Sequence, residues 1–218
     1  KGSYRKIVLG RKTEVDMGAD CDPAVTLASR LSTSVDAFLM RRGEACYWGL
    51  SPERLLSRRQ GQVWTEALAG TRARGVTPES DQRLERELLA SEKDRREQDF
   101  VREFVQHAME ARCDRVQVGL TQVRKFRSIQ HLYTTFQGHL KNPGSFAALA
   151  DALHHTPAVA LFSHGRQLGL IRELEGFDRG WYGGVTGWLS RDQGELAVGI
   201  RSCLSRWASW TFWTGAGI

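Results

Sequence analysis

A lysine and a glutamate fall on a predicted helical face that is otherwise apolar. Residues 80–112 contain no proline or glycine and carry many opposite charges four positions apart, which predicts one long helix. At roughly 100° per residue, one face carries an apolar set: Leu89, Phe100, Phe104 and Ala108. Lys93 and Glu97 fall on the same face, where buried charge is costly unless it is paired or used. Either the two form a surface salt bridge where the helix protrudes, or Glu97 points into a cavity as a ligand for a hard cation.

Two loop segments carry further candidates. In residues 51–54 (SPER), Pro52 removes a strand hydrogen bond, so Glu53 lies at a strand end where a side chain can point into a cleft. The alternative is an ordinary turn carboxylate. In residues 66–75 (EALAGTRARG), small residues allow close backbone approach, and the Gly70 N–H can bind an anion. The alternative is a plain tight turn, and the segment lacks the GK[ST] sequence of a P-loop.

Histidine and arginine candidates follow later in the chain. His154 and His155 join a helix to an apolar run, and we expect adjacent side chains to point in two directions, which argues against a metal site formed by both. A substrate-facing role for one of them and a packing role are both open. Arg201 ends a predicted strand, where an arginine can clamp a carboxylate with two hydrogen bonds or pair with a surface acid.

The elements that must position these residues form an α+β pattern. Strands are predicted at residues 6–10, 37–40, 46–50, 54–57, 63–67, 185–189, 195–200 and 209–213. Shorter helices are predicted at residues 145–153 and 166–174, and at residues 22–31, where Asp22 is the N-cap and Pro23 opens the first turn. Because no repeat or linker divides the chain, we expect one domain over residues 1–218.

Composition narrows the class of protein and of partner. The 218 residues are 41% hydrophobic and 26% charged, which is ordinary for a globular chain and excludes disordered and collagen-like classes. No apolar run approaches the roughly 20 residues of a membrane span, and no secretory leader opens the sequence. The net charge of +6 is spread along the chain without a nucleic-acid-binding signature, so we expect a small anion rather than nucleic acid or a membrane as partner. Separated cysteines predict a reduced, cytoplasmic protein.

Nine segments follow one another in a recognisable order. They are residues 6–9 (KIVL), 51–54 (SPER), 65–71 (TEALAGT), 93–97 (KDRRE), 130–132 (QHL), 153–158 (LHHTPA), 177–184 (FDRGWYGG), 200–202 (IRS) and 215–218 (GAGI). In this order they resemble the chorismate-utilising enzymes over essentially the whole chain, and within that family most closely the isochorismate synthases of menaquinone or siderophore pathways. The resemblance implies an antiparallel β-sandwich flanked by helices, with chorismate as substrate and Mg²⁺ as cofactor.

The resemblance also implies a role for each matched residue. Isochorismate synthases add water at C2 of chorismate while the C4 hydroxyl leaves, so Lys6 would be the base and Glu53 the acid. Glu97 would hold the Mg²⁺ that neutralises the ring carboxylate. The other substrate carboxylate would be bound by Arg201 and the backbone of Gly215, with Tyr182 nearby. Pocket-lining roles fall to His154 and Thr71, beside Gly70.

Departures from the family pattern leave alternatives open. His155 and Leu161 stand where proline and glycine are usual, and Trp213-Thr214 replaces Tyr-Ala. A second Mg²⁺ carboxylate and a substrate-binding lysine would lie beyond the last residue, so we expect a catalytic fragment, incomplete at both ends, with little activity by itself. Salicylate synthases share the lysine, whereas anthranilate and aminodeoxychorismate synthases usually have glutamine there. A basic ligand-binding module without turnover is the alternative that is not an enzyme.

Overall fold

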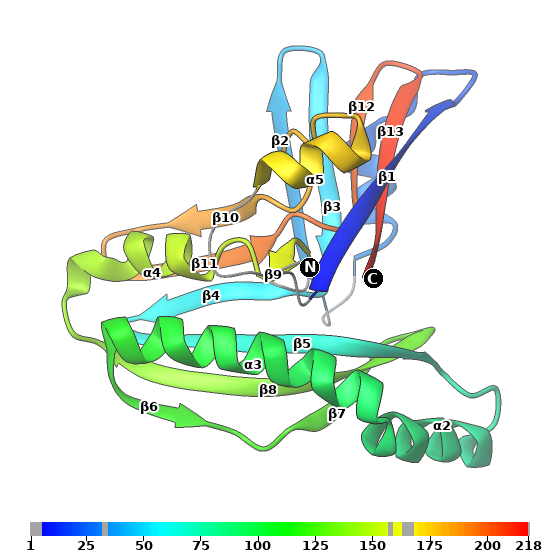
Figure 1. The fold of residues 1–218 in the computed structure, drawn as a ribbon. Coiled ribbons are helices and arrows are strands. Elements are labelled where there is room, and N and C mark those ends of the chain that lie inside the picture. Colours follow the sequence, from blue (N-terminus) through cyan, green and yellow to red (C-terminus); the bar gives the residue numbers. More distant parts are fainter. Residues whose placement is uncertain (1–5, 32–34, 157–158, 163–167, 218) are drawn as a thin grey trace. The chain divides into compact units, whose positions relative to one another are not determined.

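The computed structural model describes residues 6–31, 35–156, 159–162 and 168–217 (Figure 1). The chain divides into two units. Unit 1 comprises Lys1–Leu55, Val159–Leu189 and Glu195–Ile218, and unit 2 comprises Leu56–Ala158 and Ser190–Gly194. The expectation of one catalytic domain over the whole chain stays a prediction.

Unit 1 is built on a six-stranded sheet. Its strand order is β2-β3-β12-β13-β1-β9, and each neighbouring pair is antiparallel. The strands are β1 (Lys6–Asp16), β2 (Asp36–Arg42), β3 (Ala45–Ser51), β9 (Leu161–Phe162), β12 (Ser202–Arg206) and β13 (Ser209–Gly217). The helices α1 (Pro23–Ala28) and α5 (Leu168–Glu175) belong to the same unit.

Strands β1 and β13 are longer than the sequence predicts. Their pairing runs from Val8 opposite Gly217 to Asp16 opposite Ser209, beyond the predicted ranges 6–10 and 209–213. The outer half of β1, residues 11–16, is exposed and mostly charged or polar, so it shows no alternation of apolar and polar residues. Pairing with β13 holds this half extended, because the partner strand supplies its backbone hydrogen bonds.

A second sheet has seven strands. Its order is β10-β11-β4-β5-β8-β6, and β7 also pairs with β8. The strands are β4 (Arg54–Arg59), β5 (Gln62–Ala73), β6 (Cys113–Val118), β7 (Gln122–Lys125), β8 (Ile129–Leu140), β10 (Val185–Leu189) and β11 (Gln193–Val198). Within unit 2, the long antiparallel pair of β5 and β8 forms the centre, from Gln62 opposite His139 to Ala73 opposite Ile129.

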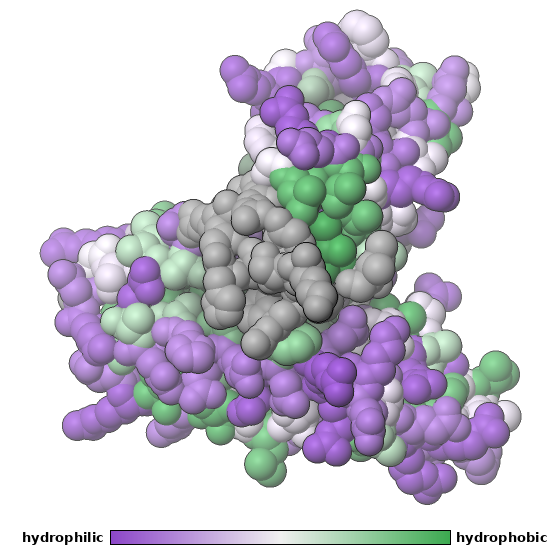
Figure 2. Space-filling view, in the orientation of Figure 1, coloured by the Kyte–Doolittle hydropathy of each residue, from purple (hydrophilic) through white to green (hydrophobic). Residues whose placement is uncertain are grey.

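The long helix predicted over residues 80–112 is two helices, α2 (Pro78–Ala90) and α3 (Glu92–Arg112). Between them Ser91 has an extended backbone, and its hydroxyl oxygen accepts a hydrogen bond from the Asp94 N–H at 3.3 Å. Ser91 therefore caps a new helix instead of continuing the first, and the prediction of one helix is wrong there. Helix α3 lies along the face of β5 and β8 (Figure 1), and its outer surface is largely hydrophilic (Figure 2).

The shorter helices match the predictions. Asp22 caps α1 by accepting a hydrogen bond from the Ala24 N–H at 2.8 Å, with Pro23 in the first turn. Helix α4 (Phe146–Leu153), preceded by the 3-10 turn η1 (Pro143–Ser145), lies within its expected range. Helix α5 ends one residue beyond its expected range, and residues 166 and 167 lie outside the described residues. No helix in the described part of the chain is both long and apolar enough to span a membrane.

Strands in residues 113–140 are absent from the sequence-based prediction. Here β8 buries polar side chains, including Gln130 and Thr134, both 0% exposed. Buried polar residues conceal the alternation on which strand prediction depends. The expected α+β class, with antiparallel sheets and helices, is confirmed.

Candidate active site

The predicted site residues are divided between the two units. Unit 1 holds Lys6, Glu53, Tyr182, Arg201 and Gly215, and unit 2 holds Gly70, Thr71, Glu97 and His154. Each unit positions its own residues by local packing, which can be followed residue by residue.

Tyr182 and Gly215 lie together in unit 1. Gly215 is on β13, opposite Gly10 of β1. A methyl group added to Gly215 would lie 2.7 Å from the Tyr182 hydroxyl oxygen, so only glycine leaves room for that hydroxyl. The structure thus brings together two of the predicted substrate-binding residues.

An aromatic cluster fixes the Tyr182 ring. Tyr182 is 7% exposed and stacks on Trp213, with 5.9 Å between ring centroids and an interplanar angle of 10°. Tyr47 packs edge-on against Trp213 at 6.4 Å. Burial raises the pKa of the Tyr182 phenol, while the nearby Arg179 guanidinium opposes that rise. The phenol is therefore protonated at neutral pH and can donate a hydrogen bond to an anion such as a carboxylate.

Glu53 is buried at the break between β3 and β4. It is 4% exposed, and its backbone is held at both ends of the residue. Its N–H donates to the Ser51 hydroxyl oxygen at 3.2 Å, and its carbonyl accepts from the Val198 N–H at 3.0 Å. Glu53 is thus a buried residue and not part of an exposed turn, and hydrogen bonds to Ser51 and from Val198 hold its backbone.

Arg201 lies in the turn before β12, not at the end of β11. The predicted strand at residues 195–200 ends at Val198, and Arg201 has a backbone φ of +51°. Its side chain is exposed, and its carbonyl accepts a hydrogen bond from the Leu50 N–H at 3.2 Å. The neighbouring Ile200 packs against the cluster of Tyr47, Tyr182 and Trp213, so Arg201 lies beside the residues that hold Tyr182.

Lys6 is the first residue of β1. Its backbone pairs with Phe162 of β9, while its side chain lies outside the described residues. Its role as a base stays a prediction. The segment that carries it is nevertheless well defined, because Val8 and Gly10 are part of the β1–β13 pairing.

In unit 2, Gly70 forms a bulge in β5. It has a φ of +70°, and the pairing with β8 shifts between Ala69 and Thr71. A methyl group on Gly70 would lie 3.0 Å from Cβ of Asp94 in the first turn of α3. Glycine is needed here both for the left-handed backbone and for the close approach of the helix.

His131 holds the bulge, although the sequence analysis assigns it no role. Its Nδ1 lies 3.0 Å from the Gly70 carbonyl oxygen and 2.9 Å from the Thr71 hydroxyl oxygen. Because a carbonyl can only accept, this geometry assigns the proton to Nδ1 and leaves Nε2 as an acceptor in the neutral ring. The predicted pocket residue Thr71 is exposed beside it. The QHL segment, residues 130–132, was the signal in the sequence that could have pointed to His131.

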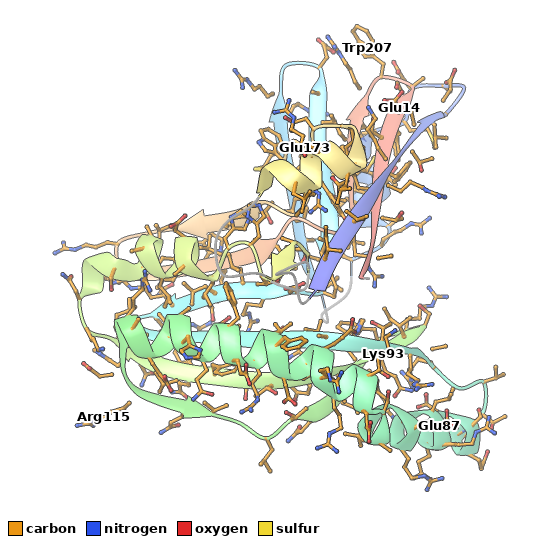
Figure 3. All side chains as sticks on the ribbon, viewed as in Figure 1. Glu14, Glu87, Lys93, Arg115, Glu173 and Trp207 are labelled. Carbon is orange, nitrogen blue, oxygen red and sulfur yellow. The ribbon has the colours of Figure 1, made fainter. Side chains whose placement is uncertain are left out.

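Glu97 lies at the edge of the buried face of α3, not at its centre. The buried residues are Asp94, Gln98, Val101, Val105, Ala108 and Met109. Glu97, Phe100 and Phe104 are half-buried, and Lys93 is exposed (Figure 3). The predicted face is therefore wrong by about one residue. The reason is Gln98, whose side-chain amide donates to the Ala67 carbonyl at 3.0 Å and the Thr134 hydroxyl at 3.1 Å, so a polar anchor rather than an apolar stripe turns the helix.

The donors on α3 fit part of a Mg²⁺ site. Asp94 and Glu97 are one turn apart, but Asp94 also lies 3.5 Å from the Arg72 guanidinium. Within the described ranges, no three His, Cys, Asp or Glu side chains gather as a metal cage. Mg²⁺ is commonly held by one or two carboxylates together with substrate oxygens and waters. The chemistry of these donors fits a cation shared with a substrate.

His154 follows α4 directly. It is half-buried, and its ring lies against that of His155, with 3.5 Å between centroids and an interplanar angle of 30°. The expectation that the two rings point in two directions is therefore wrong. Pro157 and Ala158, which complete the LHHTPA segment, lie outside the described residues.

The sequence profile of the family described as "Chorismate binding enzyme" matches residues 1–218. The chain belongs to this family. Such a match over the whole chain covers every segment described above, from the strand that begins at Lys6 to the end of β13.

Relatives within the family carry specific names. The chain is 38% identical over 208 residues to the salicylate biosynthesis isochorismate synthase of Pseudomonas aeruginosa, covering 94% of this chain and 44% of the relative. Its fold matches the menaquinone-specific isochorismate synthase MenF of Escherichia coli with a TM-score of 0.88 at 32% identity, covering 100% of this chain and 51% of that one.

A second activity occurs among the structural neighbours. Anthranilate synthase component I from Streptococcus pneumoniae matches with a TM-score of 0.77 at 25% identity, covering 99% of this chain and 48% of that one. The chain spans about half the length of the relatives it matches.

Proposed function

We propose that the protein converts chorismate to isochorismate. The observation that carries this proposal is the similarity, at 38% identity across 94% of the chain, to a relative named isochorismate synthase. The reaction adds water at C2 and expels the C4 hydroxyl, so it needs a base, an acid and a site for two carboxylates.

The proposed carboxylate site is the surface of Tyr182 and Gly215. A protonated, buried phenol beside an exposed strand end offers a hydrogen-bond donor without adding charge. Arg201, exposed beside the same aromatic cluster, would supply the positive charge and two parallel hydrogen bonds. These three residues would hold the substrate carboxylate that does not take part in the reaction.

The proposed acid and base are Glu53 and Lys6. Glu53, which is buried, would deliver a proton to the leaving hydroxyl. Lys6 would take a proton from water. Mg²⁺, held by Glu97 together with the substrate, would neutralise the ring carboxylate.

Salicylate synthesis is the closest competitor, because it uses the same lysine and then eliminates pyruvate. Anthranilate synthesis is disfavoured by Lys6, which stands where ammonia-using members usually have glutamine. The names of the relatives favour isochorismate as the product, including the relative from salicylate biosynthesis.

Product analysis tests the proposal. The purified protein, at its natural length, is incubated with chorismate and Mg²⁺, and the products are separated by liquid chromatography. Isochorismate without pyruvate is the expected result. Salicylate with equimolar pyruvate, or anthranilate formed only with ammonia, would assign the competing activities. Unchanged chorismate that still binds, measured by calorimetry, would indicate a binding module.

A matched pair of lysine variants tests the proposed base. Lys6→Ala should lower kcat by about 10²–10⁴-fold, the usual contribution of a general base. Lys12→Ala is the control, because Lys12 lies on the same strand, is exposed, and pairs with Glu14, also exposed, at 2.8 Å. Near-normal turnover in Lys6→Ala would end its assignment as the base.

A further inference from the structure

One edge of β1 is completed by side chains rather than by a strand. On one side β1 pairs with β13 along nearly its whole length. On the other side, within the described part of the chain, β9 pairs with Lys6 and Ile7, and the Val8 N–H donates to the Ala160 carbonyl at 2.9 Å. The next groups on this edge are the Val8 carbonyl and the Gly10 N–H, because backbone groups of alternate residues point to the same side. An open edge would leave both to water or to another chain.

Arg179 and Glu175 satisfy these two groups. The Arg179 guanidinium donates to the Val8 carbonyl at 2.8 Å and to the Val159 carbonyl at 2.7 Å. The Glu175 carboxylate accepts from the Gly10 N–H at 2.6 Å. The two side chains also pair with each other, with Arg179 Nε 2.9 Å from Glu175 Oε2. One ion pair thus satisfies two backbone groups of β1 that a neighbouring strand would otherwise pair.

The pair is buried and closely fitted. The Glu175 side chain is 1% exposed and that of Arg179 is 14% exposed. A planar guanidinium can donate along several fixed directions at once, which the single ammonium of lysine cannot reproduce. By contrast, the ion pair of Arg172 with Asp178 in the same region is 73% and 68% exposed and 3.6 Å long.

The same pair touches the proposed carboxylate site. The Arg179 guanidinium lies 5.5 Å from the centre of the Tyr182 ring. A methyl group on Gly10 would lie 3.2 Å from Glu175 Oε1 and 3.3 Å from Tyr182 Cε1, so carboxylate and phenol both rest on this glycine. Glu175, Arg179 and Tyr182 therefore meet over the part of β1 that follows Lys6.

We propose that Arg179 and Glu175 are positioning residues: they fasten the first part of β1 to the segment that carries Tyr182, and so fix the Tyr182 hydroxyl against Gly215. The pair touches no reacting atom. Its importance for substrate binding rests on the proposed function, whereas the fastening of β1 does not.

The test compares Arg179→Lys with the matched control Arg172→Lys. Two measurements are made on each protein: hydrogen exchange of the Gly10 amide by NMR, and the KM for chorismate. In Arg179→Lys the Gly10 amide should exchange faster, and KM should rise by about tenfold or more, the equivalent of one lost hydrogen bond of about 1.4 kcal/mol. Arg172→Lys should change neither quantity.

The KM separates positioning from folding. A purely structural defect would reduce the fraction of active molecules and leave KM unchanged, because the remaining folded molecules have an intact site. If Arg179→Lys does not fold, Glu175→Gln serves instead, since its amide keeps the shape and an acceptor for Gly10 but loses the charge that orients Arg179. In Arg179→Lys, faster exchange with an unchanged KM, or unchanged exchange, would overturn the proposal; in Glu175→Gln, which keeps the acceptor, an unchanged KM would overturn it.

Failure of the proposed function gives a different result. If the unmodified protein neither converts nor binds chorismate, the proposed function is refuted and the KM readout disappears. The fastening of β1 is then judged by amide exchange alone. It is refuted if the Gly10 amide exchanges as slowly in Arg179→Lys as in the unmodified protein.

Discussion

Replacing Gly215 with alanine tests whether the Tyr182 hydroxyl occupies the space beside β13. The new methyl group would lie 2.7 Å from the hydroxyl oxygen and 3.4 Å from Cγ1 of Val8. The first distance is shorter than van der Waals contact, so the ring or the strand must move. Tyr182 is 7% exposed and stacked on Trp213, which prevents the ring from turning aside without losing that contact.

The expected cost follows from this overlap. Adding a methyl group to a well-packed site costs about 1–3 kcal/mol in the free energy of unfolding. Because the nearest clash is with one oxygen, Tyr182→Phe should remove part of it, and we expect a coupling of about 1 kcal/mol between the two substitutions. Gly169→Ala is the control: nothing lies within 4 Å of its new methyl group. Because this position is helical, Gly169→Ala should raise the free energy of unfolding by up to about 1 kcal/mol.

Urea unfolding of four proteins measures the coupling: the unmodified chain, Gly215→Ala, Tyr182→Phe and the double variant. The unfolding midpoints and slopes give the free energies. The reasoning is refuted if Gly215→Ala costs as much in the Tyr182→Phe background as in the unmodified chain, since the hydroxyl would then not be the obstacle. Under the proposed function, KM for chorismate should rise in Gly215→Ala and stay unchanged in Gly169→Ala.

Further predictions concern unit 2. The Arg74 guanidinium, the Gly75 N–H and the Lys125 ammonium donate hydrogen bonds to the Asp81 carboxylate and hold its pKa well below the usual range. These bonds therefore stabilise the folded protein above the unfolded pKa of about 4, and this stabilisation is lost as the pH falls further. The difference between the urea unfolding midpoints at about pH 6 and about pH 3 should therefore be smaller in Asp81→Asn than in the unmodified protein. Gly70→Ala should lower the free energy of unfolding in urea by about 1–3 kcal/mol, because the backbone φ is +70° and the new methyl group would meet α3. Gln98→Met should lower the free energy of unfolding by about 1–3 kcal/mol in the same assay, because it removes two buried hydrogen bonds, and no change would show that they contribute nothing.

Local signals in the sequence predicted local structure well. The helix that starts after Asp22 forms because the capping carboxylate and Pro23 act within one turn. Most predicted strands also form. In β3, β4 and β5 the buried residues follow one another without strict alternation, so short apolar runs were the signal that predicted them. Ser91 is the exception among local signals: the same residue tolerates a helix interior and caps a helix start, and the sequence does not distinguish the two.

The order of chemically important segments was also readable from the sequence, because family membership depends on residue identity along the chain. Lys6, Glu53 and Glu97 are named from that order. What each side chain touches is a different question. The burial of Glu53 follows from its turn, but the half-buried position of Glu97 depends on how Gln98 anchors α3 to β5 and β8.

Tertiary structure alone decided the contacts between distant segments. Glu175 lies 165 residues from Gly10 and Arg179 lies 171 residues from Val8, yet these side chains complete one strand edge. No periodicity encodes such a pairing, because it depends on which backbone groups of β1 lie beyond the two residues that pair with β9. The sequence by itself determined which residues are available for chemistry; the fold determined which of them meet, because hydrogen-bond satisfaction and close packing act between neighbours in space rather than neighbours in the chain.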